Sequence, residues 1–192
     1  MDHKILQEDL IFVTETWMEP WMEKAEINDF KSAFAYGKSG KGKGVGVFFK
    51  EDAIIEVCEE QLYQIIKYKA KQITIFCLYI SKGCDFSQLV QSLEILNFND
   101  ENEVTCLIGD LNFDHPGKND LTKYLSRLNF SQMVKKATHL DGNILDHVYV
   151  PEKLANLVEI RHHYVYYSDH DAIMVDVKMD TSFLKPFVQF NA

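Results

Sequence analysis

The sequence predicts a layered α/β sandwich that consists mainly of β-strands, and three observations support this fold class. About ten short segments have the composition of strands, whereas only two segments have clear helical periodicity. Several predicted strands follow one another with only a turn between them, which disfavours a parallel sheet of the Rossmann type. The length of 192 residues, of which 46% are hydrophobic, suits one domain over residues 1–192 with a sizeable core.

The predicted strands show two hydrophobic patterns. Near the C-terminus, Ile173, Val175 and Val177 occupy alternate positions, which is typical of a strand with one buried face. Residues 75–80 are continuously apolar, which indicates a central strand that is covered on both faces. The predicted strands are residues 9–14, 32–36, 44–49, 53–57, 63–68, 73–80, 104–108, 144–150, 157–167 and 172–178.

Two segments are predicted to be helical. Asp85 is a suitable N-cap for the first helix, because its side chain can accept the free N–H groups of the first turn. Apolar residues then recur every three or four positions in both segments, which places them on one face of each helix. These residues are Phe86, Leu89, Val90, Leu93 and Leu96 in the first helix, and Leu121, Tyr124, Leu125 and Leu128 in the second.

The charge and the cysteines limit the classes of protein to consider. The formal net charge of −9 argues against attachment to nucleic acid by bulk electrostatics, although residues 31–50 and 61–82 contain lysines and no acidic residue. No apolar run is long enough to span a membrane, and the acidic N-terminus does not resemble a signal peptide. The four cysteines lack CxxC spacing, so we expect reduced thiols in an intracellular protein, nuclear or cytoplasmic and not secreted.

Charged or amide residues stand where several of the apolar strands end. A carboxylate at a strand end is stable if it faces a cleft and binds a cation. Oxygen ligands without a Cys/His cluster favour Mg²⁺ or Mn²⁺ over zinc, and an Asp–His pair suggests a histidine oriented by a carboxylate. The residues are Glu15, Asp110, Asn112, Asp146, Asp169 and His170.

These residues, in this order, resemble the endonuclease/exonuclease/phosphatase superfamily, whose members are deoxyribonuclease I-like. The similarity is greatest to the endonuclease domains of non-LTR retrotransposons, and it extends from about residue 9 to residue 178. It implies a four-layered αββα sandwich of two mixed, mainly antiparallel sheets. The segments that carry it are residues 14–17, 44–49, 77–79, 108–114, 132–134, 137–139, 145–150 and 168–171.

The resemblance implies a metal-dependent phosphodiesterase, most similar to a DNA endonuclease, with Mg²⁺ or Mn²⁺ as cofactor. Glu15 would be the principal metal ligand, and Asp169 would be a second ligand that binds directly or indirectly. The catalytic residues would have different roles: His170 contacts the phosphate, Asp146 orients His170, Asp110 transfers a proton, Asn112 positions the nucleophile and Tyr79 hydrogen-bonds the phosphate. Lys41, Lys43, Thr138 and His139 are predicted contacts to DNA.

The sequence departs from the family pattern at its N-terminal end. The strand that normally precedes the metal-binding glutamate, and that carries an asparagine, is absent, because Glu15 lies close to residue 1. We therefore expect an N-terminally truncated sandwich, with an exposed edge or a gap filled by another segment or another chain. His139 stands where retroelement domains carry an arginine.

Two other functions are compatible with the same motifs. One is a catalytically inactive, transposon-derived binding module, which the absent first strand favours. The other is a phosphatase that acts on a smaller phosphoester and shares the metal site. Trp17 and Trp21 also allow two interpretations: packing in the core or anchoring a loop, which we favour, and stacking on a nucleic-acid base.

Overall fold

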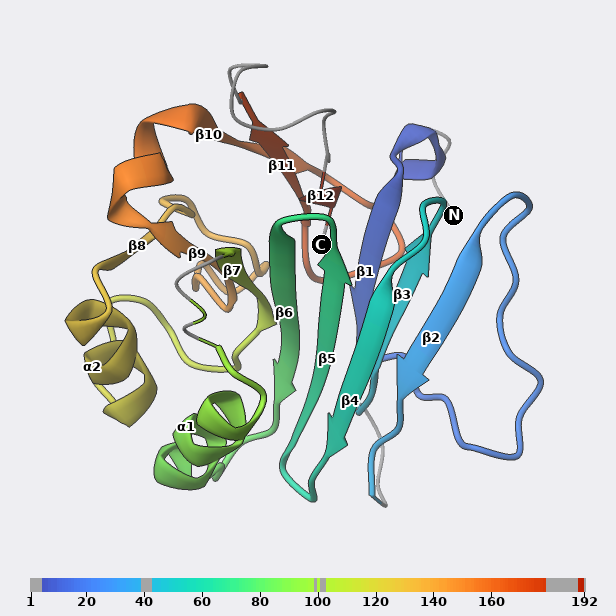
Figure 1. The fold of residues 1–192 in the computed structure, drawn as a ribbon, viewed down its shortest axis with the longest axis horizontal. Helices are drawn as coiled ribbons and strands as arrows, with labels where there is room; N and C mark the ends of the chain where they lie inside the picture. The colour runs from blue at the N-terminus through green and yellow to red at the C-terminus, as the bar shows by residue number, and fades with distance from the viewer. Residues whose placement is uncertain (1–4, 39–42, 99, 101–102, 179–189, 192) are drawn as a thin grey trace.

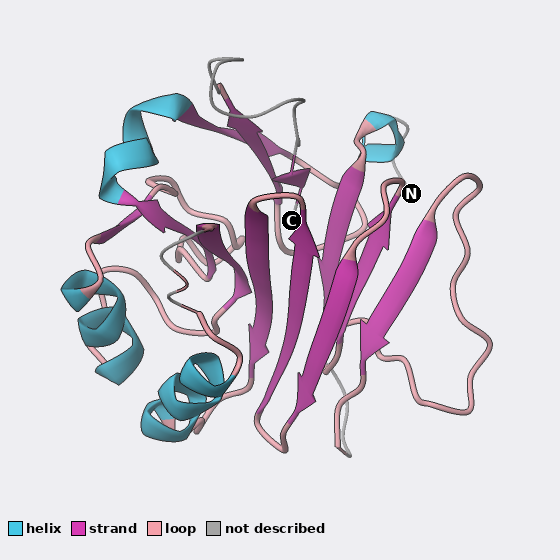
Figure 2. Cartoon of the chain, viewed as in Figure 1, coloured by secondary structure: helices cyan, strands magenta, loops and turns pink. Residues whose placement is uncertain are grey.

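Two six-stranded β-sheets pack face to face (Figures 1 and 2). The structure is a computed structural model that describes residues 5–38, 43–98, 100, 103–178 and 190–191. The first sheet has the order β10 (Val158–His163), β11 (Ala172–Val177), β12 (Phe190–Asn191), β1 (Leu10–Thr14), β3 (Val45–Phe49), β2 (Lys31–Ala35). The second sheet has the order β4 (Ile54–Glu59), β5 (Tyr63–Ala70), β6 (Ile73–Ile80), β7 (Val104–Asp110), β9 (Asp146–Pro151), β8 (Phe130–Gln132).

The strand pairings confirm the predicted mixed sandwich. Among the described strands, β1 with β12 and β6 with β7 are parallel neighbours, and the other pairings are antiparallel. Each predicted strand corresponds to an observed one, with shifts of a few residues at the ends. The sequence analysis did not predict β8 and β12, because strands of three and two residues are too short to show a period.

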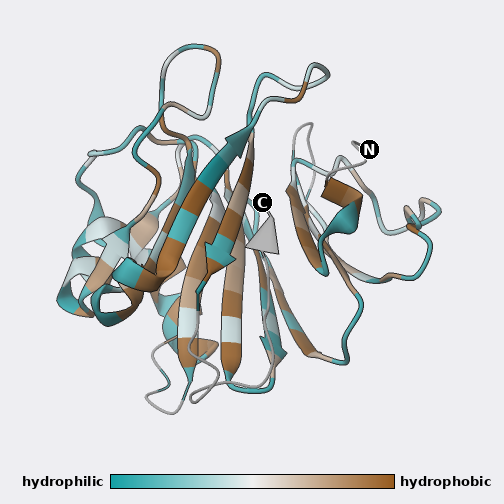
Figure 3. Cartoon of the chain, turned by 90° about the horizontal axis from the view of Figure 1, so that it is seen from above, coloured by the Kyte–Doolittle hydropathy of each residue, from teal (hydrophilic) through white to brown (hydrophobic). Residues whose placement is uncertain are grey.

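The central core lies between the two sheets, and β6 explains its hydrophobic pattern. Ile75, Cys77 and Tyr79 face the first sheet, whereas Phe76 and Leu78 face the helices on the other side of the second sheet. Because both faces of β6 are covered, all eight of its residues are buried. Figure 3 shows hydrophobic residues concentrated on the strands of both sheets.

Helices cover the outer face of the second sheet. They are α1 (Phe86–Ile95) and α2 (Asp120–Arg127), which lie side by side (Figure 1). Their buried leucines pack on the outward side chains of β6. Asp85 caps α1 as predicted, and Asn119 forms a capping box with Thr122 in α2. Within the described residues, no helix is long and apolar enough to cross a membrane.

Loops, rather than α-helices, cover the described part of the first sheet on its outer face. A small cluster there joins Ile11, Phe34 and Phe48 of the sheet to Val165 of the loop between β10 and β11. Short 3-10 helices occur at Ile5–Gln7 and Glu152–Leu157. In this part of the chain, the expected second helical layer is therefore a layer of loops.

The strand β12 occupies the position between β1 and β11. It pairs in parallel with β1, where Leu10 is opposite Phe190, and antiparallel with β11, where Val175 is opposite Phe190. Of the two arrangements expected for this sheet, an exposed edge or a filled gap, the described strands have the second. The segment that fills the gap belongs to the same chain.

Candidate active site

Three neighbouring strands of the second sheet bring Tyr79, Asp110 and Asp146 into one row. Tyr79 near the end of β6 pairs with Asp110 at the end of β7, and Asp110 pairs with Asp146 at the start of β9. Because β6 and β7 are parallel and β9 is antiparallel to them, two strand ends and one strand start meet at the same edge of the sheet. The row explains why polar residues recur at these points of the sequence.

Gly109 allows β6 and β7 to approach each other beside this row. Its φ of +134° is outside the range that residues with a side chain commonly adopt. A Cβ atom at this position would lie 1.9 Å from the carbonyl oxygen of Leu78. The glycine before Asp110 is therefore required for the pairing that places the carboxylate.

Glu15 reaches the row from the first sheet. Thr14 pairs with Val45, and the next backbone bond of the ladder runs from the N–H of Thr16 to the carbonyl of Gly44. Glu15 and Thr16 together thus face one residue, as in a β-bulge, and Glu15 has a left-handed φ of 51°. Its Oε1 atom accepts a hydrogen bond of 2.8 Å from the hydroxyl of Tyr79, which joins the two sheets at the site.

Asp110 is the buried carboxylate of the site, and its side chain is tied to Asn112. Only 2% of Asp110 is exposed, and its Oδ1 accepts the backbone N–H of Asn112 at 2.9 Å. Burial, followed by the negative charge of Asp146, raises the pKa of Asp110 to about 7. This carboxyl group can therefore exchange a proton near neutral pH.

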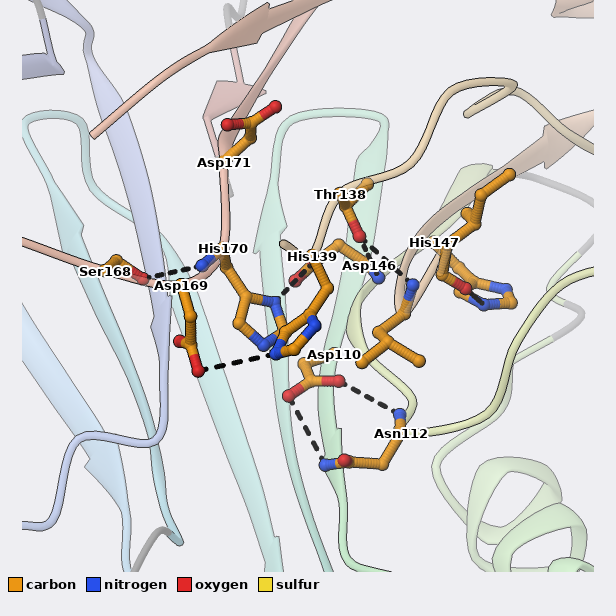
Figure 4. Close-up of polar contacts among 12 residues, drawn as sticks. Asp110, Asn112, Thr138, His139, Asp146, His147, Ser168, Asp169, His170 and Asp171 are labelled. Atoms are coloured by element: carbon orange, nitrogen blue, oxygen red, sulfur yellow. Dashed lines mark hydrogen bonds and ion pairs between the residues drawn. The ribbon is translucent and has the colours of Figure 1, made fainter. Parts of the chain in front are cut away.

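His170 is held by Asp146 on the other side of the row (Figure 4). The Nδ1 atom of His170 lies 2.7 Å from Oδ2 of Asp146, and this hydrogen bond raises the pKa of His170 to about 9. Thr138 supports the arrangement, because its hydroxyl accepts the backbone N–H groups of Leu145 and Asp146, each at 3.1 Å. The imidazole is therefore oriented and positively charged at neutral pH.

Asp169 lies with the histidines rather than with Glu15. Its Oδ2 is 3.4 Å from Nε2 of His139, and the ligand atoms of His139, Asp169 and His170 all lie within 4.8 Å of one another. Among the described residues, no other group of three or more His, Cys, Asp or Glu side chains has its ligand atoms this close together, and Glu15 is not a member of the group. Of the two residues predicted as metal ligands, only Asp169 belongs to this group.

Of the four residues predicted to contact DNA, the structure describes three, and each has a different environment. Thr138 is 2% exposed and its hydroxyl is occupied, so it supports the site from within instead of facing a substrate. His139 borders the site with its side chain 16% exposed. The Nζ atom of Lys43 donates to the carbonyl of Gln61 at 2.7 Å, and Lys41 lies outside the described residues.

The structure contradicts one part of the interpretation that we favoured for the two tryptophans, packing in the core. Trp17 is 54% exposed and Trp21 is 79% exposed, on the loop that follows Glu15. Neither ring is part of a core cluster. The predicted core packing is therefore wrong for both rings, and anchoring of the loop stays a prediction.

The sequence analysis assigned no role to His147, which the structure places behind the site. It is fully buried, and its Nε2 donates to the carbonyls of Phe113 and Ile144, each at 3.0 Å. Burial lowers the pKa of His147 to about 4, so it is neutral and cannot substitute for His170. Its position one residue after Asp146 was the available signal, because neighbouring residues of a strand face opposite ways.

A cavity lies along β10. It has a volume of about 910 Å³, and Lys135, Arg161 and Lys178 are among the residues that line it. Arg161 already pairs with Asp176 at 2.5 Å, and Lys178 pairs with Glu159 at 2.7 Å. Tyr79, Asp110 and Asp146 do not line this cavity. The cavity is therefore not the place where the row of strand-end residues would act.

Comparison with known proteins shows the fold of the chain. No protein-family model and no curated protein sequence matches it. Among solved structures, the endonuclease domain of TRAS1, a telomere-specific non-LTR retrotransposon, superposes with a TM-score of 0.63 at 11% identity, covering 90% of this chain and 86% of that one. The cytolethal distending toxin of Actinobacillus actinomycetemcomitans gives a TM-score of 0.58 at 12% identity, covering 89% and 86%.

A third similar structure is an endonuclease/exonuclease/phosphatase family protein from Leptotrichia buccalis. Its TM-score is 0.58 at 16% identity, and the match covers 92% of this chain and 90% of that one. The chain therefore has the deoxyribonuclease I-like fold of the endonuclease/exonuclease/phosphatase proteins, as the motifs predict.

Proposed function

We propose that this protein is a divalent-metal-dependent phosphodiesterase that hydrolyses DNA. The observation that carries the proposal is that Asp110, in the row of strand-end residues, and His170, bonded to Asp146 of the same row, both have raised pKa values. Asp110 titrates at about 7, and His170, held by Asp146, titrates at about 9. Groups with such shifts in one site are typical of acid–base chemistry.

His170 would bind the phosphate. With Nδ1 committed to Asp146, its Nε2–H points away from that carboxylate and can donate to a non-bridging phosphate oxygen. Its positive charge also offsets charge that develops on the phosphoryl group. Asp146 has a positioning role, because it acts through the imidazole.

Asp110 would move the proton. Its pKa of about 7 lets it accept a proton from the attacking water or return one to the leaving oxygen. Asn112 is fixed beside it by two contacts to the same carboxylate, 2.9 Å from the backbone and 3.4 Å from the side-chain amide. The amide can thus position the nucleophile or the phosphate relative to Asp110.

The donor atoms on the Glu15 side of the site fit a hard cation. The negative charges of Asp146 and Glu15 both contribute to the raised pKa of Asp110. A cation bound among the three carboxylates would relieve this repulsion. Carboxylate oxygens suit Mg²⁺ or Mn²⁺, and Glu15 would be the principal ligand. When bound, the ion would offset negative charge on the phosphoryl oxygens.

DNA is the proposed substrate for two reasons. The endonuclease domain of TRAS1 has the same fold, although this similarity alone leaves the substrate open. Trp17 and Trp21, exposed on the loop after Glu15, are suited to stacking on unpaired bases. Since the chain has a net charge of −9, we expect weak binding that depends strongly on salt.

The test is cleavage of plasmid, abasic and single-stranded DNA by the purified protein, with Mg²⁺, with Mn²⁺ and with chelator. We expect metal-dependent cleavage that His170→Ala and Asp110→Ala each reduce by about 10²- to 10⁴-fold, as for loss of an acid–base group. His162→Ala is the matched control, because His162 also contacts an aspartate but lies on β10, outside the row.

Equal background for the wild type and both variants, with and without metal, would contradict the enzymatic function. Retained DNA binding in that case would indicate the inactive binding module. Turnover of a small phosphoester without DNA cleavage would indicate the phosphatase.

A further inference from the structure

His139, Asp169 and His170 form a group with ligand chemistry different from that of the Glu15 side. Their ligand atoms lie within 4.8 Å of one another. The two loops that carry them are joined by backbone contacts. His139 and His170 form a β-bridge, the N–H of Leu140 donates to the carbonyl of Asp169 at 3.0 Å, and the N–H of Asp171 donates to the carbonyl of Thr138 at 2.8 Å. The backbone therefore holds the three side chains together.

Each of the two imidazoles has a carboxylate at its Nδ1 atom. Nδ1 of His170 lies 2.7 Å from Asp146, and Nδ1 of His139 lies 3.5 Å from Oδ2 of Asp141. Nδ1 of His139 also accepts the backbone N–H of Asp141 at 3.1 Å. Histidines that bind metals commonly use one ring nitrogen for the ion and the other for a carboxylate or carbonyl.

The two rings lie against each other, and one ligand atom of each is within 4.8 Å of the other. The rings lie 4.8 Å apart between centroids at an angle of 79° (Figure 4). Oδ2 of Asp169 is 3.4 Å from Nε2 of His139, and the Asp169 side chain is 67% exposed. Ligand atoms of a tetrahedral zinc site lie roughly 3.3 Å apart, given Zn–N distances near 2.0 Å. The exposed aspartate can rotate to reach that spacing.

We propose that His139, Asp169 and His170 form a site for a divalent transition-metal ion of the Zn²⁺ class. Two imidazole nitrogens and one carboxylate oxygen favour such ions over Mg²⁺, which prefers oxygen ligands. Three protein ligands leave a fourth position for water or a phosphate oxygen. Binding of the ion at Nε2 of His139 requires the ring proton to move to Nδ1. Nδ1 then gives up the N–H bond from the Asp141 backbone and can donate to the Asp141 carboxylate instead.

Occupation of this site has a consequence that rests on the proposed function. Nε2 of His170 donates to the phosphate only while it is protonated, and it must release that proton to bind the ion, so it cannot do both at the same time. Ions of the Zn²⁺ class therefore inhibit the Mg²⁺-dependent reaction. The binding of the ion itself does not depend on whether the protein is a nuclease.

The test uses the full chain and Co²⁺ as a spectroscopic probe that Zn²⁺ displaces. We expect one equivalent of Co²⁺ to give visible absorption bands typical of nitrogen and oxygen ligands. His139→Ala weakens binding by more than about 100-fold, and Asp141→Asn, which removes the carboxylate behind His139, weakens it by about 10-fold. His162→Ala is the control, because His162 also lies 3.4 Å from a carboxylate, that of Asp171.

Absence of bands in the wild type, or equal Co²⁺ affinity of the wild type and His139→Ala, would overturn the proposed site. Circular dichroism of each folded variant excludes unfolding as the cause of lost binding. Cleavage assays then separate the two proposals. Intact Co²⁺ binding without any cleavage rejects only the nuclease, and cleavage that stoichiometric Zn²⁺ does not inhibit rejects the inhibitory role.

Discussion

At the scale of single residues, the environments of two histidines shift their pKa values in opposite directions. His147 is buried and neutral, with a pKa lowered to about 4 by desolvation, whereas the bond to Asp146 raises the pKa of His170 to about 9. The buried ring of His147, on β9, donates to the carbonyls of Phe113 and Ile144. The bond to Phe113 keeps the loop after Asp110 in place. Its role is therefore structural.

The lowered pKa of His147 predicts acid destabilisation. The unfolded chain binds a proton at about pH 6.5 and the folded chain only near pH 4, so stability is full above 6.5 and falls as the pH decreases through 4. We expect this group to remove about 2 kcal/mol between about pH 7.5 and about pH 5. Urea unfolding at both values measures the difference.

His147→Gln should reduce this pH dependence, because glutamine does not titrate. His162→Gln serves as a control for the loss of a histidine elsewhere. A pH dependence that is the same in wild type and His147→Gln would show that other groups cause the acid sensitivity.

At the scale of elements, the close contact between β6 and β7 determines where the carboxylates lie. The pairing Tyr79–Asp110–Asp146 requires the backbone of Gly109 to touch that of Leu78. A side chain at this point would separate the strands and move Asp110 away from the row. The packing of the central strands and the geometry of the site thus depend on the same glycine.

Gly109→Ala should destabilise the protein by more than about 4 kcal/mol, because its Cβ would overlap the Leu78 carbonyl. Gly142→Ala is the matched control. Gly142 also has a positive φ, of 86°, but nothing lies within 4 Å of a Cβ there. We expect this variant to lose only about 1–2 kcal/mol, the cost of a left-handed alanine. Equal losses in thermal unfolding would contradict the steric argument.

At the scale of the whole molecule, β12 connects the two halves of the first sheet. It lies between β1, which leads to Glu15, and β11, which follows His170. Without this pairing, β1 and β11 would each present an unpaired edge in the middle of the sheet. The position of Glu15 relative to His170 therefore depends on a segment almost 180 residues away from β1 in the sequence, at Phe190–Asn191.

Removal of residues 179–192 should therefore lower the melting temperature by roughly 5 °C, the shift that a loss of about 2 kcal/mol gives at this size. It should also promote association through the exposed edges, which light scattering detects. Addition of a peptide of residues 179–192 should restore part of the lost stability. An unchanged melting temperature would mean that β12 contributes nothing to the sheet.

Local patterns in the sequence determined most of the elements and the candidate residues. The alternation at Ile173, Val175 and Val177 and the helix stripe after Asp85 predict β11 and α1, because burial repeats with the period of each element. Polar residues at strand ends likewise identify Asp110, Asp146 and His170, since a charge beside an apolar strand requires a specific partner. These patterns predicted a layered α/β sandwich, and the resemblance of the motifs to a known family predicted the deoxyribonuclease I-like fold.

Only the tertiary structure decided which of these residues meet. The insertion of β12, the bulge at Glu15 and the approach of Asp169 to His139 instead of Glu15 all depend on contacts between distant segments. The pKa values of Asp110, His147 and His170 likewise depend on burial and on neighbours from other strands. Sequence periodicity reports which side of an element is buried, but pairing between distant elements depends on packing that no local pattern encodes.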